Sequence, residues 1–367
     1  MKTPHSRREF IDRSIRLGAA AIAAPMAASL TAHAQEGKKL GFALVGLGSL
    51  STNQIAPALQ KTKHCRLAAI VTGTPAKEQI WADKYNIPRK NIYNYQTFDR
   101  IADNPEIDVV YVVLPNAMHG EYTIRAAKAG KHVLCEKPME VSAKRCEQMI
   151  EACQKAKRKL AIGYRCQFAP HHLEVMRLAR EKVFGAVKII EASFGFRIGD
   201  PKQWRLRYDL AGGGALMDVG IYALQGARYV SGEEPIEVFA TETKTDKVKF
   251  KEVDESILWS MRFPSGVVAN CSTTYLVGGI NRLFAAAETG WFELDPAYSY
   301  GGLKGRSNKG EMDFPQVDHF ATEMDDFASC IINSKPTRAP GEEGLRDVKI
   351  MTAIYESIRK GRAIKLG

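Results

Sequence analysis

Apolar and helical segments alternate regularly along the first half of the chain. Runs that are apolar almost throughout predict strands buried on both faces of a parallel sheet, at 40–45, 66–71, 107–114 and 132–134. Segments with helical spacing follow these runs, at 53–60, 76–85, 98–102, 121–129 and 142–158. This alternation predicts a doubly wound α/β domain, which we expect over residues 35–160.

The pattern changes beyond residue 161. Several segments alternate apolar with polar residues, which predicts an antiparallel sheet with one covered face. The expected strands are 187–196, 236–243, 256–262, 267–272, 283–287 and 291–294, and the expected helices are 173–181, 317–332 and 345–359. Residues 161–367 are therefore expected to form a second, α+β domain.

The first 34 residues have the form of an export signal. They hold the twin-arginine sequence Ser6-Arg7-Arg8-Glu9-Phe10-Ile11, a weakly apolar run over 17–30 and the cleavage-like Ala32-His33-Ala34. The run is shorter than the ~20 residues that a membrane-spanning helix needs. We expect export of the folded protein to the periplasm by the twin-arginine machinery, with Gln35 as the new N-terminus. A cytosolic protein with a frayed N-terminal helix is the alternative.

Composition and charge narrow the function classes. The 367 residues are 45% apolar and 25% charged, as in ordinary soluble proteins. The formal charge is +11, but residues 1–34 hold five basic and two acidic side chains, which leaves +8 for the remainder. These charges are scattered, so nucleic-acid binding is not expected. The seven cysteines form no C-x-x-C pair and no cluster with metal-ligand spacing, so we expect free thiols and no metal site.

A glycine-rich turn follows the first predicted strand. Gly46 and Gly48 fit the first two positions of a dinucleotide fingerprint, in which one glycine makes the turn and the next lets the backbone approach a pyrophosphate. Ser51 replaces the third glycine. We expect the turn to bind a dinucleotide through Gly46, Gly48, Ser49 and Leu50, although the motif alone also fits an ordinary strand-to-helix turn.

The second predicted strand lacks the acidic residue by which NAD-specific proteins hold the ribose 2′-hydroxyl. It is followed instead by Thr72, Thr74 and Lys77. A 2′-phosphate can accept hydrogen bonds from the threonines and pair with the lysine. This strand end predicts NADP rather than NAD, and the alternative is that Lys77 is only a solvated helix residue.

Two later strands end in polar residues at the edge where ligands of doubly wound sheets bind. The first is followed by Pro115, Asn116 and His119, which we expect to contact the cofactor. Asn116 would bond the nicotinamide ribose or carboxamide, and a helix cap is its alternative role. The second ends in Glu136 and Lys137. We expect both to contact the cofactor and Lys137 to be the catalytic amine.

Three glycines at 212–214 precede a segment with Asp218 and Tyr222 four residues apart, on one face of a predicted helix. Lys137, Asp218 and Tyr222 together form a proton-handling set for alcohol oxidation. Because the reference pKa values of tyrosine and lysine are both about 10, neighbouring charges must adjust them. A helix N-cap network is the alternative role for Asp218 and Tyr222.

In this order, Gly46-Leu47-Gly48, Pro115-Asn116, Glu136-Lys137-Pro138 and Gly-Gly-Gly-Ala-Leu-Met-Asp resemble the Gfo/Idh/MocA oxidoreductase family. The resemblance covers nearly all of the chain after residue 34. It implies an N-terminal Rossmann domain and a C-terminal domain with a large open, mainly antiparallel sheet used for subunit contacts. The use of that sheet for subunit contacts implies a homo-oligomer, either a dimer or a tetramer.

Within the family the chain is most similar to the glucose-fructose oxidoreductase branch, through residues 163–166, 203–205 and 232–235 and through Tyr222, where most members have histidine. The similarity implies Lys137 beside the reacting hydroxyl, Tyr222 as acid and base, Asp218 as its support, and tightly bound NADP(H). The residues implied for sugar contact are Tyr164, Arg165, Arg205, Asp218 and Tyr222.

An exported enzyme meets no replenished pool of free NADP. We therefore predict a cycle in which an aldose such as glucose is oxidised to its lactone and a second sugar, fructose-like or an aldose, is reduced to a polyol with the cofactor bound throughout. One alternative is an ordinary NADP-dependent sugar dehydrogenase with a dissociable cofactor. It is favoured because only residues 35–39 stand where the branch has a long arm around the cofactor. The other alternative is a non-catalytic sugar sensor. The intact Lys137, Asp218 and Tyr222 argue against it.

Overall fold

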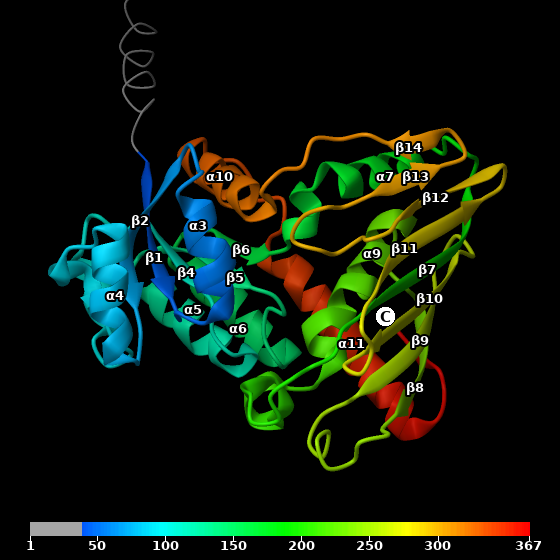
Figure 1. Ribbon diagram of the computed structural model, residues 1–367, viewed down its shortest axis with the longest axis horizontal. Coiled ribbons are helices and arrows are strands. Elements are labelled where there is room, and N and C mark those ends of the chain that lie inside the picture. The colour runs from blue at the N-terminus through cyan, green and yellow to red at the C-terminus, as the bar shows by residue number, and fades with distance from the viewer. Residues whose placement is uncertain (1–38) are drawn as a thin grey trace, which may run out of the picture. The chain divides into compact units, whose positions relative to one another are not determined.

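Two sheets organise the residues that the computed structural model describes, which are residues 39–367 (Figure 1). The export signal expected at 1–34 lies outside these residues. Residues 40–367 cluster as one unit that contains both sheets. Among the described helices, none has both the length and the apolar character needed to cross a membrane.

The first sheet has six strands in the order β3-β2-β1-β4-β5-β6, all of them parallel. Its central strands are buried throughout, which explains their continuous apolar runs. The strands are β1 (Leu40–Val45), β2 (Cys65–Val71), β3 (Ile92–Tyr93), β4 (Val109–Val112), β5 (His132–Glu136) and β6 (Leu160–Gly163). The helices between them are α3 (Ala56–Leu59), α4 (Pro75–Tyr85), α5 (His119–Lys128) and α6 (Ala143–Lys155). The predicted Rossmann fold is confirmed, and the strand order reverses between β1 and β4, where such folds bind ligands.

The second sheet has nine strands in the order β14-β13-β12-β11-β7-β10-β9-β8-β15. All its pairs are antiparallel except β7 with β10, so the mainly antiparallel prediction is confirmed. The longer strands are β7 (Val187–Gly195), β8 (Glu237–Thr243), β9 (Ser256–Arg262), β10 (Val268–Thr274), β11 (Ile280–Ala287) and β12 (Gly290–Leu294). The short strands β13 (Gly305–Ser307), β14 (Gly310–Met312) and β15 (Ile364–Lys365) carry too few residues to show a pattern and were not predicted.

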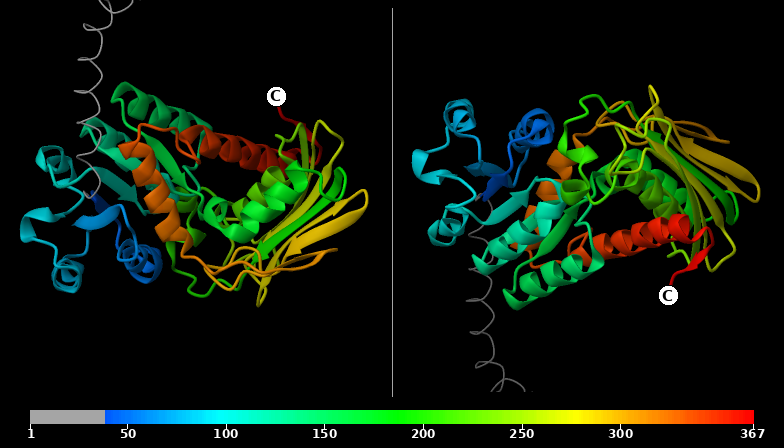
Figure 2. Two further views of the ribbon diagram at one scale, coloured as in Figure 1. Left: turned by 90° about the horizontal axis from the view of Figure 1, so that it is seen from above. Right: turned by 90° about the horizontal axis from the view of Figure 1, so that it is seen from below.

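Helices cover only one face of the second sheet. Buried and exposed residues alternate along β9, where Ile257, Trp259 and Met261 point to the core. The views in Figures 1 and 2 show α9 and α11 on this inner face and, among residues 39–367, no helix on the other. The helices of this half are α7 (Pro170–Arg180), α8 (Tyr208–Ala211), α9 (Ile221–Ser231), α10 (His319–Ile332) and α11 (Gly341–Lys360).

The last two helices pack against the first sheet. Phe320, Met324 and Phe327 of α10 share one apolar core with Phe42 and Leu44 of β1. The backbone N–H of Ile162 in β6 donates to the carbonyl of Ala339, just before α11. Because the end of the chain returns to the Rossmann sheet, the two halves hold each other in a fixed register.

Buried charges attach α9 to α11. Arg228 of α9 is 3% exposed and its Nη1 lies 2.5 Å from Asp347 Oδ1 and 2.9 Å from Glu343 Oε1. Removing one partner of such a buried network leaves an uncompensated charge, which typically costs about 3–5 kcal/mol. The helix that carries Tyr222 is therefore firmly anchored along its length.

Candidate active site

The glycine-rich turn after β1 has the backbone that a dinucleotide site needs. Gly46 has φ = 88°, in the left-handed region that favours glycine, and a Cβ there would lie 2.3 Å from the carbonyl oxygen of Val113. The Ser51 hydroxyl donates to the Gly46 carbonyl at 2.5 Å, so the serine that replaces the third glycine fastens the turn. A Cβ added to Gly48 would meet nothing within 4 Å, and Ser49 is exposed, so the outer side of the turn is open.

The residues predicted to recognise a 2′-phosphate lie near this turn. The Thr72 hydroxyl is buried and accepts a hydrogen bond from the Thr74 backbone N–H at 3.1 Å. Lys77 extends from α4 to the turn, where its Nζ donates to the Leu47 carbonyl at 2.6 Å. An anionic group on the turn would therefore meet a fixed ammonium.

Asn116 joins the end of β4 to the second half of the chain. Its side chain is buried and its Nδ2 donates to the carbonyl of Ala211 at 2.8 Å, directly before the glycines at 212–214. One of these, Gly214, packs so closely that a Cβ would lie 2.0 Å from the Asp254 carbonyl oxygen. The expected cofactor residues Pro115 and Asn116 thus lie where the two halves meet.

His119 holds two strand ends together. Its Nδ1 lies 2.9 Å from the Pro138 carbonyl and its Nε2 lies 2.8 Å from the Leu114 carbonyl. Burial lowers the pKa of this imidazole despite these acceptors. Both ring nitrogens are engaged with the backbone, so His119 positions the segment that carries Lys137 instead of offering the expected cofactor contact.

Glu136 is also directed into the protein. One carboxylate oxygen accepts the Tyr111 hydroxyl at 2.8 Å and the other accepts the Lys137 backbone N–H at 3.2 Å. Burial raises the pKa of Glu136, and the nearby Lys137 opposes this shift only in part. Its side chain therefore shapes the strand end, and its expected contact with the cofactor stays a prediction.

Lys137 and Asp218 meet across the junction of the two halves. The Lys137 ammonium donates to the backbone carbonyl of Asp218 at 2.7 Å and lies 3.7 Å from the Asp218 Oδ1 atom. The two side chains are 11% and 14% exposed. An ammonium has three N–H donors, so further donors can point toward a substrate oxygen.

The other oxygen of Asp218 is held by two groups. Arg205 Nε and the Tyr275 hydroxyl each donate to Oδ2 at 3.0 Å. Burial disfavours the charged form, but Arg205, Lys137 and Tyr275 outweigh it and lower the pKa of Asp218. Arg205, expected to contact the sugar, thus fixes the aspartate as an anion. Tyr275, which directly follows β10, has no motif in the sequence that marks it as a site residue. Only the tertiary fold brings it to Asp218.

Tyr222 lies beside two cations. Arg165 Nε donates to its hydroxyl at 3.2 Å, and the Lys137 Nζ lies 4.7 Å from its ring centroid. Burial raises the pKa of Tyr222, while the Arg165 guanidinium acts in the opposite direction. The structure therefore brings Lys137, Asp218 and Tyr222 together, as the sequence suggested.

The helix that carries this pair differs from the predicted one. Asp218 lies in a π-helical turn over Leu216–Gly220, and α9 begins only at Ile221. Such turns widen a helix and are frequent at functional sites. The Asp218 carbonyl that accepts from Lys137 lies within this turn.

Tyr164 and Arg165 follow β6 and point to different places. Tyr164 is 1% exposed and lies near Asp347, Tyr229 and Glu343, which add to burial in raising its pKa. The expected sugar contact from Tyr164 is therefore wrong, because its hydroxyl is in the core between α9 and α11. Arg165 is 2% exposed and donates to the Tyr222 hydroxyl and to the carbonyls of Tyr298 and Ser299, and its expected sugar contact stays a prediction.

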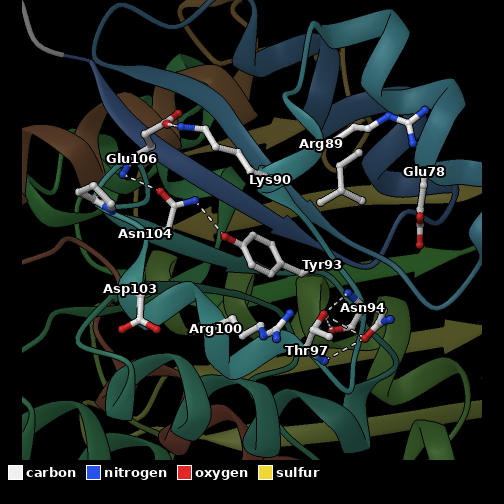
Figure 3. Close-up of a pocket in the computed structure, with 12 residues that line it drawn as sticks. Glu78, Arg89, Lys90, Tyr93, Asn94, Thr97, Arg100, Asp103, Asn104 and Glu106 are labelled. Atoms are coloured by element: carbon white, nitrogen blue, oxygen red, sulfur yellow. Dashed lines mark hydrogen bonds and ion pairs between the residues drawn. The ribbon is translucent and has the colours of Figure 1, made fainter.

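An open hollow of about 630 Å³ lies at the β3 edge of the first sheet, away from these residues (Figure 3). Its polar groups bind one another: Lys90 pairs with Glu106, and Asn104 donates to the Tyr93 hydroxyl at 2.9 Å. Since its hydrogen bonds are satisfied internally, volume alone does not make it a binding site.

A glycine-rich turn on a parallel sheet, with a lysine, an aspartate and a tyrosine at the strand ends, defines a two-domain oxidoreductase of the dehydrogenase type. Three family models match in succession: "Oxidoreductase family, NAD-binding Rossmann fold" over residues 40–164, "GFO/IDH/MocA C-terminal domain" over 172–293 and "Oxidoreductase family, C-terminal alpha/beta domain" over 307–366. The chain belongs to the Gfo/Idh/MocA oxidoreductase family, which confirms the assignment made from the sequence.

Individual relatives span almost the whole chain. The crystal structure of aldose-aldose oxidoreductase from Caulobacter crescentus, complexed with glycerol, is 45% identical with a TM-score of 0.88, covering 90% of this chain and 100% of that one. D-xylose 1-dehydrogenase [NADP(+)] of Haloarcula marismortui is 30% identical over 89% of this chain and 92% of its own. Trans-1,2-dihydrobenzene-1,2-diol dehydrogenase of Danio rerio is 31% identical over 81% of this chain and 84% of its own.

Substitution Lys137→Met tests the amine at the centre of this site. We expect substrate-dependent reduction of the nicotinamide cofactor to fall by about 10²–10⁴-fold, because the ammonium is lost while the apolar stem is kept. Lys131→Met is the matched control, since Lys131 is also buried and donates to a backbone carbonyl, that of Asn104. Activity within about threefold of wild type in Lys137→Met would contradict a catalytic role for this residue.

Proposed function

We propose that the protein is an NADP-containing sugar oxidoreductase that couples two half-reactions. An aldose is oxidised at C1 to its lactone, and a second sugar, a ketose or an aldose, is reduced to its polyol. The observation that carries this proposal is the buried Lys137–Asp218–Tyr222 cluster at the strand ends of the Rossmann sheet. Similarity to an aldose-aldose oxidoreductase at 45% identity supports the use of two sugars.

The residues of the glycine-rich turn fit a dinucleotide. The left-handed backbone at Gly46 and the open surface at Gly48 would leave room for the pyrophosphate. Thr74 and Lys77 would donate hydrogen bonds to a 2′-phosphate. The position of the Lys77 ammonium at this turn supports NADP over NAD. Relatives named for NADP(+) support the same choice.

Alcohol oxidation requires removal of a hydride from carbon and a proton from oxygen. The nicotinamide of bound NADP supplies the hydride chemistry. Lys137 holds the sugar oxygen through its remaining N–H donors, and Tyr222, present as the phenolate in this half-reaction, accepts the hydroxyl proton. Asp218, kept ionised by Arg205 and Tyr275, holds the Lys137 ammonium in place. Reduction of the second sugar reverses these proton movements.

The cofactor is proposed to remain bound between the two half-reactions. An ordinary NADP-dependent dehydrogenase that exchanges its cofactor is the second candidate, which similarity to D-xylose 1-dehydrogenase [NADP(+)] supports. A non-catalytic sugar sensor is disfavoured, because a buried ion pair with an adjacent tyrosine is costly to maintain without chemistry.

Absorbance and fluorescence spectra of the dialysed protein distinguish these possibilities. We expect the band of reduced nicotinamide to appear when glucose is added and to disappear when fructose or a second aldose follows. Denaturation should then release NADP and not NAD. The Tyr222→Phe variant, which cannot accept the proton, should retain the nucleotide without forming the band. Loss of nucleotide on dialysis, with turnover restored only by added NADP⁺, would establish the dissociable dehydrogenase instead.

We also propose that the protein is a homo-oligomer, joined through the uncovered face of the nine-stranded sheet by a second copy. Apolar side chains on this face are unusually exposed: Leu258 by 57%, Ile189 by 46% and Phe239 by 43%. The same face carries charges of both signs, such as the Arg282–Glu191 pair, so two copies related by a twofold axis can match apolar and charged positions.

Light scattering coupled to gel filtration tests this interface. We expect a dimer or tetramer for the wild type and a monomer for Leu258→Glu, because a carboxylate on this face would be buried unpaired in the interface. Val248→Glu is the control, since Val248 is 90% exposed in the loop after β8. A monomeric wild type would rule out the oligomer.

Export by the twin-arginine machinery to the periplasm is proposed from residues 1–34 alone. Cell fractionation should find the wild type in the periplasm and the Arg7→Lys, Arg8→Lys variant in the cytoplasm, because the machinery reads the paired guanidinium groups. Wild-type protein confined to the cytoplasm with its first 34 residues intact would contradict the proposal.

A further inference from the structure

Arg165 is a buried cation whose donors are all directed at protein groups. It is 2% exposed, and among residues 39–367 no carboxylate forms an ion pair with it. Its Nη2 donates to the Tyr298 carbonyl at 2.5 Å and its Nη1 to the Ser299 carbonyl at 3.2 Å. The planar guanidinium is thus fixed, which leaves Nε aimed at the Tyr222 hydroxyl, 3.2 Å away.

Aromatic rings stabilise this charge in place of a carboxylate. The Arg165 Cζ atom lies 4.8 Å from the ring centroid of Tyr222 and 4.7 Å from that of Tyr300. A desolvated guanidinium over such rings is worth about 2 kcal/mol or more. The arrangement keeps the positive charge beside Tyr222 without neutralising it.

The bond from Arg165 also sets the direction of the Tyr222 proton. A phenol oxygen that accepts from Nε–H must point its own O–H elsewhere. Tyr222 lies on α9 of the second half, whereas Arg165 and Lys137 come from the ends of neighbouring strands of the Rossmann sheet, β6 and β5. Both halves are therefore needed to orient the phenol.

We propose that Arg165 is a positioning residue that orients the Tyr222 hydroxyl and stabilises the phenolate formed when Tyr222 gives up its proton, and that it does not bind sugar. The phenolate forms when the O–H bond of Tyr222 breaks and its proton passes to the oxygen of the sugar being reduced, so one negative charge develops beside Nε–H of Arg165. This inference rests on the proposed role of Tyr222 as acid and base. It replaces the sugar contact expected from the sequence.

Other titratable groups also face Tyr222. They are Glu136 at the end of β5, Lys137 directly after it, Cys166 beside Arg165, Asp218 on the preceding turn, and Tyr300 between β12 and β13. The side chains of Glu136, Cys166 and Tyr300 can become anions but not cations, so they cannot stabilise a phenolate. Asp218 already accepts a hydrogen bond from Arg205. Arg165 is the cation among these groups that bonds to the phenol oxygen, so its removal should have an effect that theirs does not.

Direct titration of residue 222 tests the inference without any sugar. A fluorinated tyrosine, which is more acidic than tyrosine, is incorporated at position 222, and its ionisation is followed by fluorine NMR. We expect Arg165→Gln to move the ionisation to higher pH by about one to three units, because a cation within about 5 Å and its hydrogen bond are lost. Arg165→Lys should move it less, since it keeps the charge but not the fixed Nε–H.

Kinetics on the unlabelled variants give a second readout. The rate of aldose oxidation at neutral pH should fall by about 10–100-fold in Arg165→Gln, its pH profile should move upward with the titration, and KM should change by less than about threefold. Arg338→Gln is the matched control, because Arg338 also lies over a ring, that of Phe168, but does not touch Tyr222.

Each outcome decides the inference. An unchanged titration in Arg165→Gln, or a raised KM with unchanged kcat, would overturn it in favour of a structural or sugar-binding role. If Arg165→Gln does not fold, the titration of Arg165→Lys decides in the same way. A shifted titration in a protein that oxidises no sugar would keep the Arg165–Tyr222 coupling while rejecting the proposed function.

Discussion

The hydrogen bond from the Lys137 ammonium to the Asp218 carbonyl is the contact on which the site depends. Lys137 ends a strand of the parallel sheet, and Asp218 lies on a helical turn of the second half, 81 residues away along the chain. The accepting carbonyl belongs to a π-helical turn. His119 and Asn116 fix the strand ends relative to this turn. The Lys137 side chain is therefore directed at the Asp218 carbonyl.

Cations and carboxyl groups surround Tyr222. Lys137, Arg165 and Arg205 are cations, whereas Asp218 is the carboxylate whose pKa the surroundings lower. Burial raises the pKa of Glu136, and it raises that of Glu323, near Glu136 and Arg165, much further. Burial raises the pKa of Tyr222, and the Arg165 guanidinium opposes that shift. A phenolate formed on Tyr222 during proton transfer is therefore stabilised by a neighbouring cation.

Periodicity was enough to predict both sheets and most helices, since continuous apolar runs and alternating runs bury different numbers of faces. It failed for two-residue and three-residue strands such as β3 and β14, which are too short to carry a period. The motifs located Lys137, Asp218 and Tyr222. They did not distinguish Tyr164 from Arg165, because adjacent residues after a strand diverge and only the packed helices decide which one reaches the site.

The direction of a side chain at a strand end is thus a tertiary property, and the same holds for Tyr275, which no motif marks. Its consequence is chemical. Under the proposed cycle, the proton that leaves the first sugar is the proton that the second sugar needs, and microscopic reversibility gives both transfers to one phenol. A 7% exposed Tyr222, flanked by fixed cations, can keep that proton near the site between half-reactions. Burial of the acid and base is then compatible with turnover, because no net proton has to reach the solvent.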